Sequence, residues 1–265
     1  IAKGNYIALL NNDAWATKGW LTALVNTAEG DKKIGMCSSK IYLINPQEEK
    51  IIDNIGHLLY FDGSSRGKGR LEKDDGQYDN NPEAVLFPSG AACLYRMEML
   101  KEIGLFDESF FAYADDTDIG LRGRWAGWHC IYVPEAVAYH LYSASTDEYS
   151  PLKVFYVERN RVWIAIKYFP ASMLFASPYY TFLRVFFHFY GAIFGQGASG
   201  EFVKKRSIWQ LLFIVIKAYL SAIRGFPMMF RQRREMSRLK RLTSTQMKAL
   251  FRRYIISVKE ITLKK

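Results

Sequence analysis

Short apolar runs alternate with helical patterns through the first 150 residues, and no other feature constrains the fold as strongly. The run Asn5–Leu10 ends in the polar turn at residues 11–13, a pattern typical of a buried strand in a parallel sheet. Further strands are expected over Ile34–Tyr42, Phe87–Tyr95 and Cys130–Val133. Strands and helices that alternate in this way predict a layered α/β domain with a mixed sheet flanked by helices.

Capping residues mark the helices expected in this region. Thr17 is placed to cap a helix over Lys18–Ala28, which has one apolar face. The residues of that face are Trp20, Leu21, Leu24 and Val25. A second helix is expected over Arg96–Ile103, where a glycine ends it, and a third over Asp116–Gly127. The segment 62–83 has five Gly or Pro residues and many charges, so an exposed loop is expected there.

The charge distribution changes sharply near Pro151. Residues 1–150 hold 14 Lys and Arg against 22 Asp and Glu, a net charge of −8. Residues 151–265 hold 22 Lys and Arg against 4 Asp and Glu, a net charge of +18. We therefore expect a catalytic or binding domain over residues 1–150 and a basic, aromatic helical region over residues 151–265 that docks on a surface.

The apolar segments of the second part favour a membrane as that surface. Ala171–Gly195 and Ile208–Ile223 are rich in apolar side chains, and a basic stretch begins at Arg224. Such segments are typical of helices that lodge at an anionic leaflet, although neither has about 20 uninterrupted apolar residues. A buried helical subdomain with a solvated basic tail is the alternative. No nucleic-acid partner is expected, because the basic residues accompany long aliphatic stretches and not interspersed stacking side chains.

The cysteine content excludes two classes of small stabilised domain. Cys37, Cys93 and Cys130 are odd in number and lack the spacing of metal ligands. Neither a disulfide framework nor a zinc finger is therefore expected, and a reducing compartment is the default.

Acidic residues occupy two positions where α/β domains bind ligands. Asp13 follows the first strand, where a carboxylate can hold a divalent cation that binds a diphosphate; an ordinary turn residue is the alternative. Asp115, Asp116 and Asp118 follow an aromatic run at an expected helix start, where backbone N–H groups favour negative charge. Adjacent acids repel each other unless they have a task, and general-base catalysis is one such task. Asp118 is equally well explained as a cap-region acid.

Three further segments carry candidate ligand-binding residues. His140 follows a strand-like run and can ligate a metal as a neutral imidazole, or be an ordinary core or surface residue. Ser89, Gly90 and Ala91 would allow a ligand to approach the backbone closely. The run E-R-N-R at residues 158–161 places Arg side chains at the junction of the two parts, where they can clamp phosphate or be exposed.

Five stretches together resemble the inverting glycosyltransferases of family 2, and most of all their bacterial rhamnosyltransferase-like members. In order, they are G-N-Y-I-A-L-L-N-N-D, P-S-G-A-A-C-L-Y-R, G-L-F-D-E-S-F-F-A-Y-A-D-D-T-D-I-G-L-R, A-G-W and V-A-Y-H-L-Y-S-A-S. The resemblance covers residues 1 to about 170. It implies a GT-A-type, Rossmann-like fold for the α/β domain.

The resemblance also implies roles for the candidate residues. Asp13 matches the last acid of the family's metal–diphosphate motif, and Asn11 stands where the first acid often stands. Asp116 matches the catalytic base of the family's E-D-x-D motif, and Asp115 is the second candidate. His140 matches a metal-ligand histidine, so the implied cofactor is Mg²⁺ or Mn²⁺ held together with Asp13.

The implied reaction moves a sugar from a nucleotide-sugar donor to a lipid-linked or glycan acceptor. Ser89, Gly90 and Ala91 match the family segment that lines the sugar pocket, and Asn11 lies in the donor-binding motif. dTDP-rhamnose is one candidate donor, and bacterial cell-surface polysaccharide synthesis is the expected process. The implied location is the cytoplasmic face of the bacterial cell membrane, with the C-terminal helices peripheral, in-plane or spanning.

The start of the chain departs from the family pattern. Family members have a strand and a nucleotide-base pocket before the position of Gly4, whereas this chain begins at Ile1. Two or three βαβ units of about 30 residues each would be needed to build that region, so a fragment of a longer protein is expected. A non-catalytic glycosyltransferase-like binding protein and an inactive fragment are the alternative functions.

Overall fold

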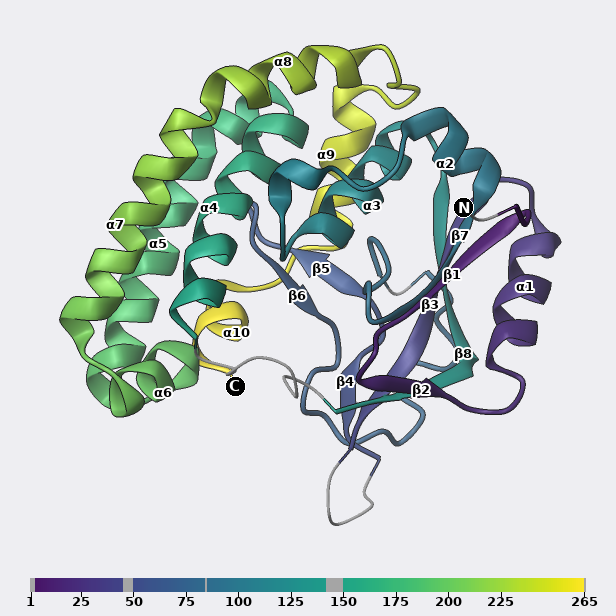
Figure 1. The fold of residues 1–265 in the computed structure, drawn as a ribbon, viewed down its shortest axis with the longest axis horizontal. Coiled ribbons are helices and arrows are strands. Elements are labelled where there is room, and N and C mark those ends of the chain that lie inside the picture. Colours follow the sequence, from purple (N-terminus) through teal and green to yellow (C-terminus); the bar gives the residue numbers. More distant parts are fainter. Residues whose placement is uncertain (1–2, 45–49, 84, 142–149, 265) are drawn as a thin grey trace.

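A six-stranded mixed sheet lies at the centre of the first part of the chain (Figure 1). The computed structural model describes residues 3–44, 50–83, 85–141 and 150–264. The sheet contains β1 (Tyr6–Leu10), β2 (Ala14–Ala16), β3 (Ile34–Leu43), β4 (Ile52–Asn54), β7 (Ala92–Arg96) and β8 (His129–His140). The order is β1-β7-β3-β8-β2, with β4 also paired to β3. Strands β3 and β8 are parallel and the other described pairs are antiparallel, which confirms the predicted mixed sheet.

Helices cover both faces of this sheet. Helix α1 (Trp20–Gly30) packs on one face, and α2 (Met97–Ile103) and α3 (Asp115–Trp125) contribute to the core on the other. Successive residues of a strand point to opposite faces, so Cys37 of β3 joins the α1 cluster while Met36 joins the larger core. The three cysteines are buried and free.

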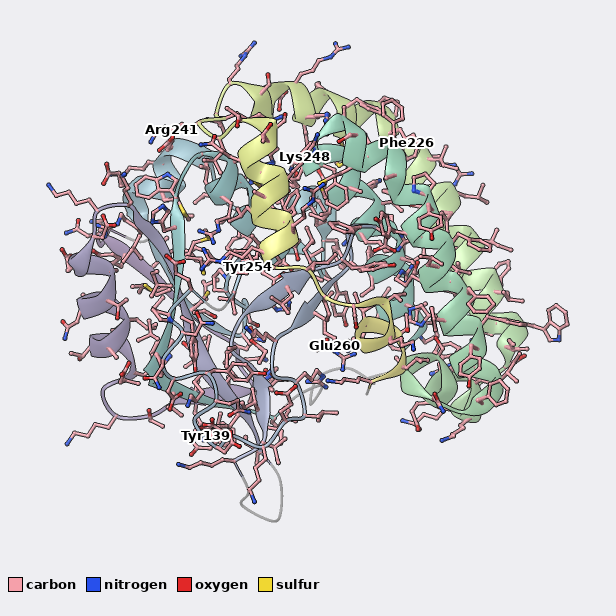
Figure 2. All side chains as sticks on the ribbon, turned by 180° about the vertical axis from the view of Figure 1, so that it is seen from behind. Tyr139, Phe226, Arg241, Lys248, Tyr254 and Glu260 are labelled. Atoms are coloured by element: carbon pink, nitrogen blue, oxygen red, sulfur yellow. The ribbon has the colours of Figure 1, made fainter. Side chains whose placement is uncertain are left out.

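The chain after residue 150 is helical wherever it forms regular elements. Its helices are α4 (Pro151–Tyr168), α5 (Ala171–Phe194), α6 (Gly197–Lys205), α7 (Ile208–Arg224), α8 (Phe226–Ser237), α9 (Ser244–Arg253) and α10 (Val258–Leu263). Seen from behind, α9 stands between the sheet and the other C-terminal helices, with Tyr254 at its end (Figure 2). Helix α4 packs into the same core as the sheet through Trp163, Ile164 and Tyr168. The division into parts 1–150 and 151–265 stays a prediction.

A short hairpin and a single 3-10 turn complete the described elements. The hairpin consists of β5 (His57–Leu59) and β6 (Ser65–Gly67), and the turn is η1 (Glu108–Phe110). The C-terminal segment pairs with the hairpin, because Leu59 N–H donates to the Tyr254 carbonyl at 3.0 Å and Ile256 N–H to the Leu59 carbonyl at 3.2 Å.

Among the described helices, none by itself has both the length and the hydropathy needed to cross a bilayer. Helices α6 and α7, bent by 120° where they meet, reach that length and hydropathy only as a pair.

Strand β1 differs from the buried parallel strand that its apolar run predicts. It lies at the edge of the sheet, pairs antiparallel with β7, and leaves Ala8 and Leu10 exposed. A short apolar run carries no information on strand direction or on the number of neighbouring strands, which explains the difference.

Three local predictions are also wrong. Gly19, with φ of +88°, takes the position before α1, and Thr17 instead donates its hydroxyl hydrogen to a carbonyl of β8 at 2.9 Å. Leu21 is 49% exposed and does not share the buried face of α1. The segment 62–83 is not a wholly exposed loop, because it contains β6 and the buried Asp62.

Candidate functional site

The turn between β1 and β2 brings Asp13 to the end of β8. Ala14 pairs with His140 in the antiparallel β2–β8 ladder, and Leu141 N–H donates to the Asp13 carbonyl at 2.9 Å. Asp13 Oδ1 consequently lies 3.2 Å from His140 Nε2. Two side chains from opposite ends of the α/β domain, both singled out from the sequence, thus meet at one edge of the sheet.

A second carboxylate orients His140 from the other side of the ring. Asp53 Oδ2 on β4 lies 2.9 Å from His140 Nδ1, and Arg70 forms an ion pair with the same carboxylate. A hydrogen on Nδ1 directed at Asp53 leaves the Nε2 lone pair facing Asp13, the arrangement that carboxylates impose on metal-binding histidines. Burial lowers the pKa of His140, but the hydrogen bond and charge of Asp53 and the charge of Asp13 raise it above its ordinary value overall.

Asp53 is a site residue that the sequence analysis does not single out. Its signal in the sequence is a lone acid inside the apolar run I-I-D-N-I. Because a buried charge is costly unless it is paired, such an acid is a reasonable candidate for a site. The pairing with His140 itself depends on the fold, since β4 and the end of β8 both lie beside β3.

The Asp13–His140 pair fits a divalent cation. Neighbouring ligand atoms of an octahedral ion, each about 2.1 Å from it, lie roughly 3 Å apart, and here 3.2 Å separates Oδ1 from Nε2. Asp13 Oδ1 and an unprotonated His140 Nε2 are both acceptors, so they repel each other at this distance. A cation between them, or a proton on Nε2, removes this repulsion. Over the residues that the structure describes, no group of three or more His, Cys, Asp or Glu side chains is arranged as a metal site. A cation held by the pair would therefore need oxygen atoms of a substrate and of water as well.

The adjacent carboxylates of Asp115 and Asp116 stand at the start of α3. Asp116 Oδ2 accepts from Gly90 N–H at 3.3 Å, and its Oδ1 accepts from Thr117 N–H at 2.6 Å. His57 Nε2, which the sequence analysis also missed, lies 3.6 Å from Asp116 Oδ2. Burial and the charge of Asp116 together raise the pKa of Asp115 to about 6. A carboxyl with this pKa gains and loses protons close to neutral pH, as acid–base chemistry requires.

The segment Ser89-Gly90-Ala91 connects the two acidic groups. On one side, Asn11 N–H donates to the Ala91 carbonyl at 2.9 Å. On the other side, Gly90 N–H holds Asp116. The Ser89 hydroxyl accepts from Ala91 N–H at 3.3 Å and stabilises the bend between them. The backbone two residues before Asp13 and the predicted base Asp116 therefore both hydrogen-bond to one short stretch of backbone.

Asp118 serves the core and not the site. Its buried carboxylate contacts Lys167 Nζ at 2.6 Å, Arg122 at 2.8 Å and the Tyr168 hydroxyl at 2.5 Å. These contacts join α3 to α4, so the third acid of the cluster anchors the helix whose first residues carry the other two.

The Arg side chains at the junction have structural partners. Arg161 binds Glu158 at 3.0 Å and Asp62 at 3.3 Å within a buried network, so it is neither exposed nor placed to clamp a phosphate. Arg159 donates to the carbonyls of Ser109 and Phe110 at 3.2 and 2.9 Å. The expectation of an exposed or phosphate-clamping Arg side chain is thus wrong for Arg161, and for Arg159, which is half-buried, it stays a prediction.

Backbone strain gathers directly before the carboxylate pair. Phe111, Tyr113 and Ala114 have φ angles of +63°, +63° and +61°. A side chain in this left-handed region costs about 1–2 kcal/mol per residue. The buried amide of Asn160 on α4, another residue without a marked signal in the sequence, hydrogen-bonds the carbonyls of this turn.

Comparison with known proteins finds one matching family and two similar curated proteins. Residues 60–164 match the family described as "Glycosyltransferase like family 2". Over 58 residues the chain is 41% identical to the N-acetylglucosaminyl-diphospho-decaprenol L-rhamnosyltransferase of Mycobacterium tuberculosis, in strains CDC 1551 / Oshkosh and ATCC 25618 / H37Rv alike. That match covers 22% of this chain and 19% of the relative's length.

Two solved structures are similar to this chain at low sequence identity. The crystal structure of GalNAc-T7 with UDP, GalNAc and Mn2+ is 16% identical with a TM-score of 0.48, covering 63% of this chain and 32% of that one. The mannosyltransferase PcManGT from Pyrobaculum calidifontis in complex with GDP-Man and Mn2+ is 11% identical with a TM-score of 0.38, covering 90% and 61% respectively.

Proposed function

We propose, from the match of residues 60–164 to the family described as "Glycosyltransferase like family 2", that the chain is a glycosyltransferase of this family. The proposed reaction transfers a sugar from a nucleotide-sugar donor with inversion at the anomeric carbon. One observation carries this proposal. The strand end that leads into Asp13 of the Asp13–His140 pair, and the carboxylate of Asp116, both hydrogen-bond to the single segment at residues 89–91. The Asp13–His140 pair suits a cation that binds a diphosphate, and the carboxylate suits removal of a proton, which are the two needs of such a transfer.

In the proposed reaction Asp116 is the general base. Its carboxylate takes the proton of the acceptor hydroxyl while the acceptor oxygen forms a bond to the anomeric carbon. The bond from that carbon to the diphosphate oxygen breaks, and the diphosphate departs with the electron pair. Attack from the face opposite to the leaving group inverts the configuration.

The chain's own groups hold these participants in place. Gly90 N–H fixes the Asp116 carboxylate, and Asp53 fixes the ring of His140. Asp13 and His140 would hold Mg²⁺ or Mn²⁺, which when bound offsets the negative charge that develops on the departing diphosphate.

For the donor we propose dTDP-rhamnose, and for the acceptor a lipid-linked or glycan substrate of bacterial cell-surface polysaccharide synthesis. Support comes from the Mycobacterium tuberculosis relative, whose name describes L-rhamnose transfer to N-acetylglucosaminyl-diphospho-decaprenol. The alternative function, the rival, is that of a non-catalytic binding protein of the same shape, which would bind the donor without transferring its sugar. Asn11, where an acid often stands in the resembling motif, motivates this rival.

Metal titration of two variants tests the proposal. Asp13→Ala and His140→Ala should each raise the Mn²⁺ concentration needed for half-maximal rhamnose transfer, because each removes one proposed ligand of the same ion. The measurement is transfer from dTDP-rhamnose to an N-acetylglucosaminyl-diphospho-lipid over a series of Mn²⁺ concentrations. Asp31→Ala, an exposed acid after α1, is the control and should leave the curve unchanged. An unchanged curve for His140→Ala would assign that residue a structural role, and donor binding without any transfer would favour the rival.

The second part of the chain presents an apolar surface that we propose lies on the cytoplasmic leaflet of the bacterial membrane. Helices α5 and α7 run along the side of the molecule that faces away from the sheet (Figure 1). Phe175 and Phe182 on α5 are 84% and 67% exposed, and Trp209 and Phe213 on α7 are 77% and 67% exposed. Exposed apolar patches of this kind mark interaction sites.

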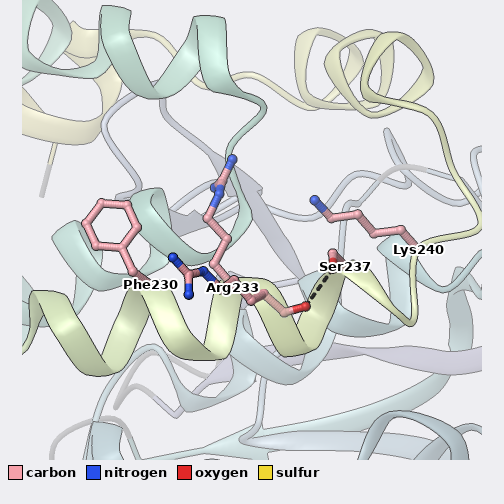
Figure 3. Close-up of a pocket in the computed structure, with 5 residues that line it drawn as sticks. Phe230, Arg233, Ser237 and Lys240 are labelled. Carbon is pink, nitrogen blue, oxygen red and sulfur yellow. Dashed lines mark hydrogen bonds between the residues drawn. The ribbon is translucent and has the colours of Figure 1, made fainter.

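Positive charge elsewhere on the second part of the chain also favours an anionic leaflet as the partner. Basic side chains gather around a pocket of about 360 Å³ at the end of α8, which has no acid among its lining residues (Figure 3). The lining residues are Phe230, Arg233, Arg234, Ser237 and Lys240. Burial and the charge of Arg233 lower the pKa of Lys240, so an anion such as a lipid phosphate would relieve the repulsion between the two cations.

Vesicle flotation tests the membrane proposal. The protein should float with vesicles that contain anionic lipid and stay bound at high salt, because salt screens the charges and leaves the apolar contribution. A Phe182→Glu/Phe213→Glu double variant should remain at the bottom of the gradient. Leu105→Glu changes a side chain of similar exposure, 65%, on the other part of the chain and should float normally. Equal flotation of the double variant and this control would contradict docking through α5 and α7.

A further inference from the structure

The turn before the carboxylate pair adopts a conformation that its residues disfavour. Phe111, Tyr113 and Ala114 all have φ near +60°, and none of the three is glycine. Residues persist in this region only where the surrounding structure holds them, and they gather at functional sites. The contacts that hold the turn are therefore part of what arranges the carboxylates.

A buried amide on α4 makes the central contacts with this turn. Asn160 Nδ2 lies 3.1, 2.8 and 2.7 Å from the carbonyl oxygens of Phe110, Ala112 and Tyr113. Asn160 itself is 0% exposed. Its two amide hydrogens are thus shared among three carbonyls of one turn, with no water needed to satisfy them.

Arg159 determines the direction of that amide. Its Nε donates to Asn160 Oδ1 at 2.8 Å. A flipped amide would direct its NH₂ group at the guanidinium and its oxygen at three carbonyls, so only one orientation is stable. The guanidinium also lies 4.1 Å from the centre of the Trp163 ring, which fixes Arg159 in turn.

The backbone connects the turn directly to the start of α3, so the conformation of the turn determines where α3 begins. Tyr113 and Ala114 lead directly into Asp115, and Asp118 N–H donates to the Ala114 carbonyl at 2.9 Å. Over the described residues, the hydrogen bonds of Asn160 go to this turn and to Arg159 and not to the carboxylates. Any effect of Asn160 on the carboxylates must therefore act through the turn.

We propose that Asn160 is a positioning residue that holds the strained turn so that Asp115 and Asp116 stand in their reactive arrangement. This inference rests on the proposed function, because the arrangement affects a rate only if one of the two carboxylates is the base. It assigns a catalytic consequence to a residue on α4, in the part of the chain that the charge distribution separates from the acidic domain.

The first test is kinetic. Asn160→Ala removes all three hydrogen bonds, and we expect kcat for rhamnose transfer to fall about 10²-fold, since a misplacement of about 1 Å has this effect. Donor affinity, measured by calorimetry with dTDP-rhamnose and Mn²⁺, should stay within about twofold, because Asn160 does not touch the proposed donor-binding residues. Met247→Ala is the matched control: Met247 is buried in α9 and makes none of the hydrogen bonds that hold the turn, so the variant should lower Tm without lowering kcat.

The second test reads the carboxylates without turnover. Burial and the charge of Asp116 raise the pKa of Asp115 to about 6, and both causes depend on the position of the turn. In Asn160→Ala the pKa of Asp115 should fall towards its ordinary value, as followed by ¹³C NMR of labelled Asp carboxyls. Met247→Ala should leave the pKa of Asp115 unchanged.

A double variant tests whether Asn160 acts by holding the turn. Ala114→Gly relieves the strain at φ of +61°, so adding it to Asn160→Ala should recover part of the lost kcat as well as Tm. An unchanged kcat or an unchanged pKa of Asp115 in Asn160→Ala would overturn the proposal. If the unaltered protein transfers no sugar, the proposed function fails instead, and the NMR titration still decides whether Asn160 governs Asp115.

Discussion

Replacing Asp116 with Asn should lower the rate of sugar transfer about 10²–10⁴-fold, the usual contribution of a positioned base. The substitution is nearly isosteric, so the amide can still accept from Gly90 N–H through its oxygen. Donor affinity should change little, because Asp116 is not one of the proposed cation ligands, which are Asp13 and His140. The measurements are initial rates with saturating donor and acceptor, and calorimetric titration of the donor with Mn²⁺.

Asp115→Asn is the matched control for that substitution. It removes the neighbouring carboxylate, whose pKa burial and the charge of Asp116 raise to about 6, and should reduce the rate less than Asp116→Asn does. In Asp116→Asn, the pKa of Asp115 should fall, because one of the two causes that raise it is gone. A larger rate loss in Asp115→Asn would make Asp115 the base, and near-normal rates in both variants would place the base elsewhere.

Replacing Arg184 with Ala should lower the free energy of unfolding by about 3–5 kcal/mol, as expected when one partner of a buried ion network is removed. Arg184 contacts Asp62 at 2.6 Å and Glu158 at 2.7 and 2.8 Å, and its exposed fraction is 3%. Two buried carboxylates would then share Arg161 alone. For a chain of this size the loss corresponds to a fall in Tm of roughly 6–20 °C, measurable by thermal denaturation.

The same network predicts how the difference in unfolding free energy between the unaltered protein and Arg184→Ala depends on pH. Burial by itself would raise the pKa values of Asp62 and Glu158, but the charges of Arg184 and Arg161 lower both below the ordinary values of 3.8 and 4.5. Carboxyls with lowered pKa values stabilise the fold above their unfolded-state values and lose that contribution as the pH falls. The difference in unfolding free energy between the unaltered protein and Arg184→Ala should therefore narrow as the pH drops from about 5 towards 3.

An exposed ion pair provides the control for Arg184. Arg231 and Glu235 lie 3.6 Å apart on α8 with side chains 75% and 61% exposed, so Arg231→Ala should change the unfolding free energy by less than about 1 kcal/mol. A comparable loss in both variants would mean that the buried network contributes no more than a surface pair.

Much of the fold and of the candidate site follows from local patterns in the sequence. Periodicity places α5 and α7 within a residue or two of their observed ends, and Gly104, with φ of +85°, ends α2 where expected. Asp13, Asp116 and His140 are identifiable because their residue types follow strands or begin a helix, positions that depend on neighbours in the chain. Such signals are local, so one sequence is enough to find them.

What the tertiary structure alone decided is which distant groups meet. The edge position of β1, the carboxylate of Asp53 behind His140, and the amide of Asn160 beneath the strained turn all depend on how separate elements pack. Asp62 gives no sequence sign of being buried, yet it is enclosed because α4 and α5 bring two Arg side chains to it. The periodicity of a sequence shows which face of a helix or strand is apolar. The partner of a buried polar group, in contrast, often lies tens of residues away in the chain. Which partner it meets therefore depends on how the whole fold packs.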